Sequence, residues 1–141
     1  MKKILCATRG GEASHRTQDA VIAMAKEEGA SVLFLFVVDV EFLKLIPQGV
    51  RPDIVSTELD HMGEFLLALA CERAAAQGVE AEVLIRHGSM PEALISVALE
   101  QRVDAVVLGQ PAGSEGAFTL PEIKRLATRI EESTGIKVYV I

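Results

Sequence analysis

Hydrophobic residues along the chain alternate between short apolar runs and longer stretches with helical spacing. Five runs have the length of strands: 2–8, 31–39, 79–87, 103–109 and 136–141. Between them, apolar residues recur every three or four positions, as on one face of an amphipathic helix. These helical stretches are 14–28, a second with the stripe Leu59, Met62, Leu66 and Leu69, a third from Ser89 to about Gln101, and a last from Thr119 to Gly135.

This order predicts a parallel sheet, because strands that alternate with helices are joined by right-handed crossovers. The run 31–39 is apolar on both faces, as in a central strand, whereas 79–87 alternates and suits a position nearer the edge. We expect one α/β domain over 1–141, with a single open five-stranded parallel sheet in the order 3-2-1-4-5 and helices on both faces. A crevice then opens beside loops 8–12 and 109–118.

Local signals fix several helix starts. Ser89 and Glu92, and likewise Thr119 and Glu122, have the spacing of a capping box with proline in the first turn. Ser14 precedes the first helical stretch and is also expected to be an N-cap.

The segment 40–55 is longer than most connections and rich in apolar residues. Two interpretations stay open. It forms a short helical turn packed on the domain, or it forms a lid over the crevice or a contact with a partner.

Composition narrows the class of protein. The chain has 141 residues and a net charge of −6, which argues against nucleic-acid binding because a phosphate backbone requires a basic surface. The longest apolar run, 32–38, is too short to span a bilayer, and the N-terminus lacks the pattern of a signal peptide. We expect a cytosolic protein without membrane contact, in which Cys6 and Cys71 are reduced structural thiols.

The side chains that usually carry catalysis are not clustered in the sequence. His15 and His61 have no second ligand at metal spacing, and His87 ends a strand beside Gly88, where it is expected to be a solvated or capping histidine, so we expect no metal site. Neither a Ser-His-Asp pattern nor a carboxylate pair falls at a strand end. An enzyme is therefore the least favoured reading, with weak ATP hydrolysis as its upper limit.

Three segments nevertheless show a resemblance. "KILCATRGGEAS", "GASVLFLFVV" and "HGSMPEALISVALEQRVDAVVLG" together resemble the universal stress protein family over nearly the whole chain. The resemblance implies the adenine-nucleotide alpha hydrolase-like fold, a small cytosolic stress-response regulator, and usually a dimer. Members of the family either bind ATP or do not.

The nucleotide motif departs from the family pattern. ATP-binding members carry Gly-x-x-Gly, nine residues, then Gly-Ser or Gly-Thr after the fourth strand. Gly109 is in place, but Ala112 stands at the second glycine, Gly113 follows one residue later, and "IKR" (123–125) falls near the Gly-Ser. The family aspartate that holds the sugar or base end matches Arg9, which cannot accept a hydrogen bond.

The resemblance therefore predicts a degenerate site for ATP, another adenine nucleotide or another anion. Its candidate residues are Ala7, Thr8, Arg9, Val38, Gly88, Leu108, Gly109, Ala112, Gly113, Lys124 and Arg125. Arg9, Lys124 and Arg125 are cations that can replace the missing glycine amides as phosphate ligands. The opposing interpretation is that Lys124 and Arg125 are solvated, and that Arg9 pairs with Glu12 or Glu115.

The last strand supplies a second hypothesis. An apolar strand at a sheet edge is rarely left exposed in a monomer, and in this family it pairs with its twin. We expect a homodimer through Val138, Tyr139, Val140 and Ile141. The alternative function is a member that binds no nucleotide and acts as a protein-interaction module, through this dimer and segment 40–55, on an unknown partner.

Overall fold

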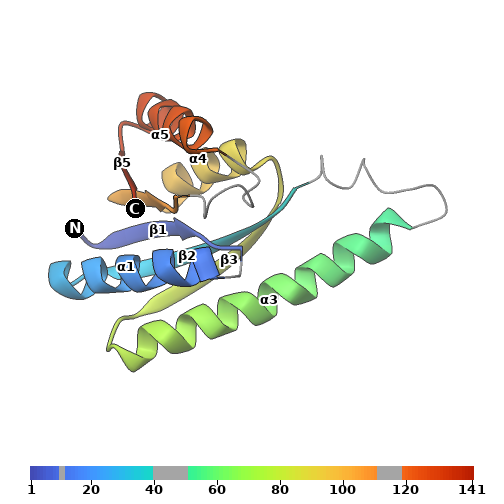
Figure 1. Ribbon diagram of the computed structural model, residues 1–141, viewed down its shortest axis with the longest axis horizontal. Helices are drawn as coiled ribbons and strands as arrows, with labels where there is room; N and C mark the ends of the chain where they lie inside the picture. The colour runs from blue at the N-terminus through green and yellow to red at the C-terminus, as the bar shows by residue number, and fades with distance from the viewer. Residues whose placement is uncertain (10–11, 40–50, 111–118) are drawn as a thin grey trace.

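The computed structural model describes residues 1–9, 12–39, 51–110 and 119–141 (Figure 1). Strands and helices alternate along the chain, as the hydrophobic pattern predicts. Their bounds are β1 (Lys3–Ala7), α1 (Glu12–Glu28), β2 (Ser31–Asp39), α3 (Pro52–Ala76), β3 (Ala81–Gly88), α4 (Met90–Glu100), β4 (Ala105–Leu108), α5 (Leu120–Thr134) and β5 (Lys137–Val140).

The five strands form one parallel sheet in the order β3-β2-β1-β4-β5, which confirms the predicted fold. β1 lies at its centre, and its Cys6 is in register with Phe34 of β2 and with Val107 of β4. β3 and β5 are the two edges. Figure 1 shows α1 and α3 on one face of the sheet and α4 and α5 on the other.

Two buried apolar layers hold these helices to the sheet. Alternate residues of each strand enter opposite layers, because successive side chains of a strand point to opposite faces. On β1, for example, Ile4 and Cys6 face the layer under α1 and α3, whereas Leu5 faces the layer under α4 and α5. β2 also contributes side chains to both layers, so it is apolar on both faces, as expected of a central strand.

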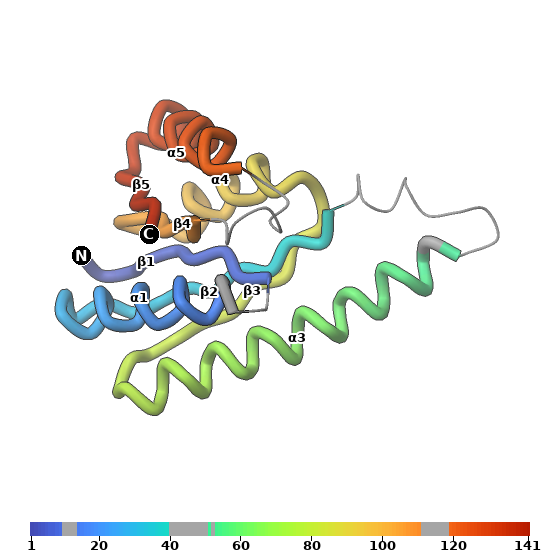
Figure 2. The backbone as a smooth tube through the Cα atoms, in the orientation of Figure 1, coloured from blue at the N-terminus to red at the C-terminus, as the bar shows by residue number. Residues whose placement is uncertain are grey.

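α3 is longer than the pattern of apolar residues indicates. It begins at Pro52, so residues 52–55 belong to the helix and not to a connection, which corrects that part of the prediction for 40–55. Residues 40–50 lie outside the described part of the chain. Figure 2 shows the first turns of α3 extending beyond the sheet.

The buried face of α3 also differs from the expected stripe. Leu59 and Leu66 are half-buried as expected, but Met62 and Leu69 are exposed. The fully buried residues of α3 are mostly small: Gly63, Leu67, Ala70 and Ala74. Small side chains let the helix approach the sheet closely, since a Cβ at Gly63 would lie 2.5 Å from the ring of Phe36. The spacing of the large apolar residues therefore predicted a buried face that is rotated about the axis of α3 relative to the face that the structure buries.

The caps follow the sequence signals in two of three cases. Thr119 and Glu122 form the complete capping box at the start of α5. Ser89 caps α4 by accepting a hydrogen bond from the Glu92 N–H. The prediction for Ser14 is wrong, because α1 begins at Glu12 and Ser14 lies inside its first turn; its Oγ accepts from the Arg9 N–H at 3.2 Å.

None of the helices in the described ranges has both the length and the apolar character needed to cross a bilayer.

Candidate functional site

Seven of the eleven candidate site residues come together at the carboxyl edge of the sheet. They stand at the ends of four neighbouring strands: Ala7, Thr8 and Arg9 at β1, Val38 at β2, Gly88 at β3, and Leu108 and Gly109 at β4. The parallel arrangement places them there, because all carboxyl ends of a parallel sheet share one edge. Ala112 and Gly113 lie outside the described residues.

Arg9 brings a positive charge to this edge. Its Nη2 lies 3.7 Å from the sulfur of Met90, the first residue of α4, and its backbone is fixed by Ser14. The side chain is exposed, but desolvation by the surrounding protein lowers the pKa of the guanidinium, and the negative charge of Asp39 at the end of β2 opposes that shift. The charge of Asp39 therefore acts on Arg9. The side chains of Glu12 and Glu115, the expected partners, are outside the described part.

A buried polar pair lies just behind Arg9. Thr8 and Gln18 are 2% and 3% exposed, and Gln18 Nε2 donates to Thr8 Oγ1 at 2.7 Å. The other amide atom, Gln18 Oε1, is buried and has no hydrogen-bond partner among the described residues. A buried acceptor without a donor lowers the stability of the fold, so an unpaired amide oxygen at this depth is unusual.

Gly109 has a packing reason to be glycine. A Cβ at this position would overlap Thr17 Oγ1 and lie 3.2 Å from Thr17 Cβ, because α1 passes close to the end of β4. Gly88 has a different reason, since its φ of 141° is a backbone conformation that other residues rarely adopt. Both glycines are thus required by the fold whether or not a ligand is bound.

The apolar candidates differ in what they can offer a ligand. Val38 and Leu108 are 1% and 3% exposed and belong to the two core layers, so only their backbone is available for contact. Ala7 is half-buried.

Lys124 and Arg125 lie elsewhere, on the solvent face of α5. Together with Thr128, Arg129 and Glu132 they line a shallow groove of about 410 Å³. The opposite face of α5, which carries Ile123 and Ile130, is buried against the sheet. The two candidate cations are therefore grouped with Arg129, a residue that the sequence reasoning missed. The four-residue spacing of Arg125 and Arg129 was the signal that could have found it.

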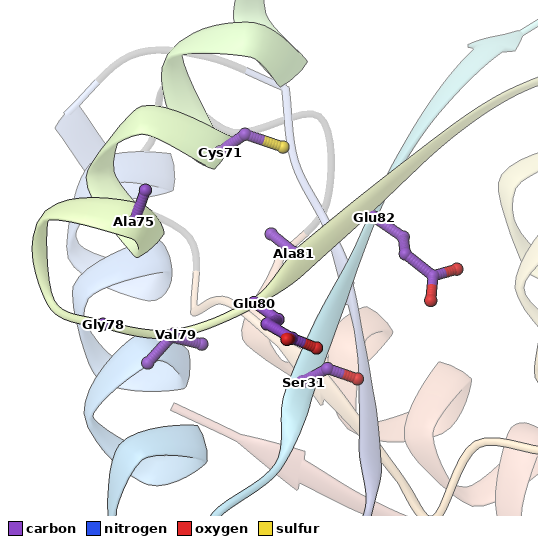
Figure 3. Close-up of a pocket in the computed structure, with 8 residues that line it drawn as sticks. All are labelled: Ser31, Cys71, Ala75, Gly78, Val79, Glu80, Ala81 and Glu82. Carbon is purple, nitrogen blue, oxygen red and sulfur yellow. The ribbon is translucent and has the colours of Figure 1, made fainter.

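A second groove, of about 500 Å³, lies at the amino end of the strands (Figure 3). It runs between the last turns of α3, with Cys71 and Ala75, and the start of β3. Glu80 and Glu82 line it, and two carboxylates repel a phosphate. This groove does not suit the predicted anion.

The thiols and histidines have structural surroundings. Burial raises the pKa of Cys6 to about 12, and burial also raises that of the half-buried Cys71, so neither is an activated thiolate. His87 Nε2 lies 2.8 Å from Asp60 Oδ1 and links β3 to α3. Within the described ranges, no three His, Cys, Asp or Glu side chains are placed to hold a metal ion.

The residues expected at a dimer interface lie on the edge strand β5 or directly after it. Val138 is buried, Tyr139 and Val140 are half-buried, and Ile141 is 38% exposed. The pairing with β4 continues past β5, because the Ile141 N–H donates to the Leu108 carbonyl at 2.9 Å. Pairing of these residues with a second chain stays a prediction.

Comparison with known proteins decides the family. The model of the universal stress protein family matches residues 1–121. The chain belongs to the universal stress protein family. Universal stress protein YxiE of Bacillus subtilis strain 168 is 28% identical over 115 residues, which cover 76% of this chain and 77% of YxiE.

Solved structures agree on the fold. A universal stress protein family member from Burkholderia pseudomallei has a TM-score of 0.77 at 21% identity, covering 99% of this chain and 95% of the other. A family member from Arabidopsis thaliana, solved with AMP bound, has a TM-score of 0.67 at 14% identity, covering 100% and 91%. The fold is the adenine-nucleotide alpha hydrolase-like fold that the resemblance implied.

Proposed function

We propose that this universal stress protein is a cytoplasmic stress-response regulator that binds an adenine nucleotide in an altered site at the carboxyl edge of the sheet. The observation that carries the proposal is the position of Arg9 directly after the central strand β1, at the edge of the sheet where the neighbouring strand β2 ends in Asp39. AMP bound to the Arabidopsis thaliana relative supports the ligand class.

In this proposal, Arg9 binds the phosphate of the nucleotide and Asp39 binds its ribose. Arg9 has five N–H donors in a planar fork that matches phosphate oxygens, and it remains charged at neutral pH. Asp39 has the acceptor oxygens that ribose hydroxyls require, which Arg9 lacks. The acidic function that the family places after β1 is then supplied from the end of β2.

Lys124 and Arg125 contribute less than Arg9 to nucleotide binding in this proposal. Their groove is on the outer face of α5, so they add to the positive potential felt by a phosphate but do not form the centre of the site. The proposal thus predicts a larger effect for Arg9→Ala than for Lys124→Ala.

Titration of the purified protein with mant-ATP tests this function. A charge-assisted hydrogen bond contributes about 1.5–3 kcal/mol, so Arg9→Ala should weaken binding roughly 10- to 150-fold. Arg9→Lys keeps the positive charge but lacks the planar guanidinium, so its affinity should lie between those of the wild type and Arg9→Ala. Arg16→Ala, an exposed arginine on α1, is the matched control and should bind like the wild type. Absence of binding at millimolar ATP refutes the proposal.

A homodimer acting through protein contacts is the second candidate function, and it is favoured by the position of β5 at the sheet edge. In this version nucleotide is not needed, and the dimer together with segment 40–55 recruits the partner. Val140→Lys should convert a dimer into a monomer by light scattering at micromolar concentration. Val83→Lys on β3, the opposite edge, is the control that should leave the dimer intact. A monomeric wild type contradicts this candidate.

A further inference from the structure

α3 carries a row of large apolar side chains that face solvent. Ile54 is 51% exposed, Met62 44%, Phe65 63% and Leu69 37%. At 100° per residue these four positions fall within about 80° of the helix circumference, in a sector that also contains the exposed Glu58 and Glu72; we call this surface the α3 outer face. Single exposed apolar residues are common on proteins, whereas several large ones gathered on one helix face are the feature expected of a contact surface.

The α3 outer face is long enough for a partner helix. From Ile54 to Leu69 the helix rises about 22 Å, or about four turns. Its first turns extend beyond the sheet (Figure 2), and none of residues 53–62 is fully buried. A partner can therefore approach these first turns of α3 without displacing another element of the described structure.

The negative charge of the α3 outer face indicates which kind of partner can bind there. Glu58, Glu64 and Glu72 are exposed, and none of them forms an ion pair with the residues that the structure describes. The two arginines of the segment are already paired, Arg51 with Asp53 at 2.8 Å and Arg73 with Asp19 of α1. The charge left over along the apolar row is negative.

We propose that the α3 outer face docks a basic amphipathic helix of a partner protein. Such a helix lays its apolar side on the row from Ile54 to Leu69 and brings lysines or arginines against the free glutamates. A second copy of α3 would bring glutamates against glutamates, and an anionic membrane surface would be repelled. This inference is independent of the nucleotide site.

The first test is fluorescence anisotropy with a labelled 18-residue amphipathic Leu/Lys helix in 150 mM salt. The wild type should bind it, and the same peptide with every Lys replaced by Glu should not bind. Phe65→Ser should weaken binding by roughly 10-fold or more, as expected for a central aromatic anchor. Leu99→Ser, which removes an apolar side chain of 52% exposure from α4, is the matched control and should bind like the wild type.

The second test separates charge from shape. A variant with Glu58→Gln, Glu64→Gln and Glu72→Gln should bind the Leu/Lys peptide more weakly and with a flatter salt dependence, while its melting temperature stays near that of the wild type. Equal binding of both peptides, or binding that Phe65→Ser leaves unchanged, overturns the proposal. So does a dimer that Phe65→Ser dissociates in light scattering, since the face would then serve a second copy. Binding to vesicles with 30% anionic lipid that Phe65→Ser abolishes overturns it as well.

Discussion

The substitution Gly109→Ala tests whether the first glycine of the candidate phosphate loop is set by packing or by a ligand. The new Cβ would overlap Thr17 Oγ1 and approach the Thr17 Cβ and Cγ2 at 3.2 and 3.4 Å. Thr17 is only 6% exposed and lies on α1, so it has little room to move. We expect destabilisation in the absence of any nucleotide.

The size of the effect follows from this overlap. Forcing a methyl group into a packed site costs about 1–3 kcal/mol. For a chain of this length, each kcal/mol lowers the melting temperature by roughly 3–4 °C, so the expected decrease is about 3–12 °C. Thr17→Ala removes Oγ1 and Cγ2, the atom overlapped and one of the two close contacts, and leaves only a tight approach between the two Cβ atoms.

Urea unfolding of the wild type, both single variants and the double variant forms a double-mutant cycle. The double variant should be more stable than the sum of the single effects predicts, by about 1–2 kcal/mol. A stable Gly109→Ala protein, or strictly additive effects, would refute the packing argument. The glycine would then be explained by the ligand.

Three further predictions concern elements away from the site. Gly63→Ala should lower the urea midpoint although alanine favours helices, because its Cβ would lie 2.5 Å from the Phe36 ring; a higher midpoint contradicts the close packing. Thr119→Ala should cost about 1 kcal/mol and more than Ser89→Ala, since only Thr119 belongs to a reciprocal box; equal losses in thermal unfolding contradict this. Asp104 accepts hydrogen bonds from two backbone N–H groups near the start of the chain, which hold its pKa below the ordinary value. A lowered folded-state pKa adds stability above the unfolded pKa, which is lost as the pH falls. The wild type should thus lose more stability than Asp104→Asn between about pH 5 and pH 2, and parallel curves contradict this.

Much of the fold follows from local patterns. The run 31–39 is apolar at every position but its ends, which is typical of a strand covered on both faces. The capping box at Thr119 marks the start of α5 within one residue, because it depends on neighbours in the chain alone. The face of α3 was misjudged for the opposite reason. It is set by the fit of Gly63 against Phe36, a contact between residues distant in the sequence.

The candidate site was likewise predicted from the sequence only in part. The sequence placed Thr8, Arg9 and Gly109 at one edge, because strand order and parallel direction follow from the alternation of elements. It did not reveal that the charge of Asp39 acts on Arg9, since strand order brings the ends of two strands together but does not fix the directions of the side chains beyond them. Nor did it reveal that Lys124 and Arg125 share a groove with Arg129 on the outer face of α5.

The sequence by itself determined the class of fold, the order of strands and the departure of the loop from the family's nucleotide motif, because these depend on periodicity and on residue identity. Only the tertiary structure decided which polar residue accompanies Arg9, why Gly109 cannot carry a side chain, and which side of α3 remains exposed. Those properties depend on distances between separate elements, and such distances arise only when the helices pack on the sheet.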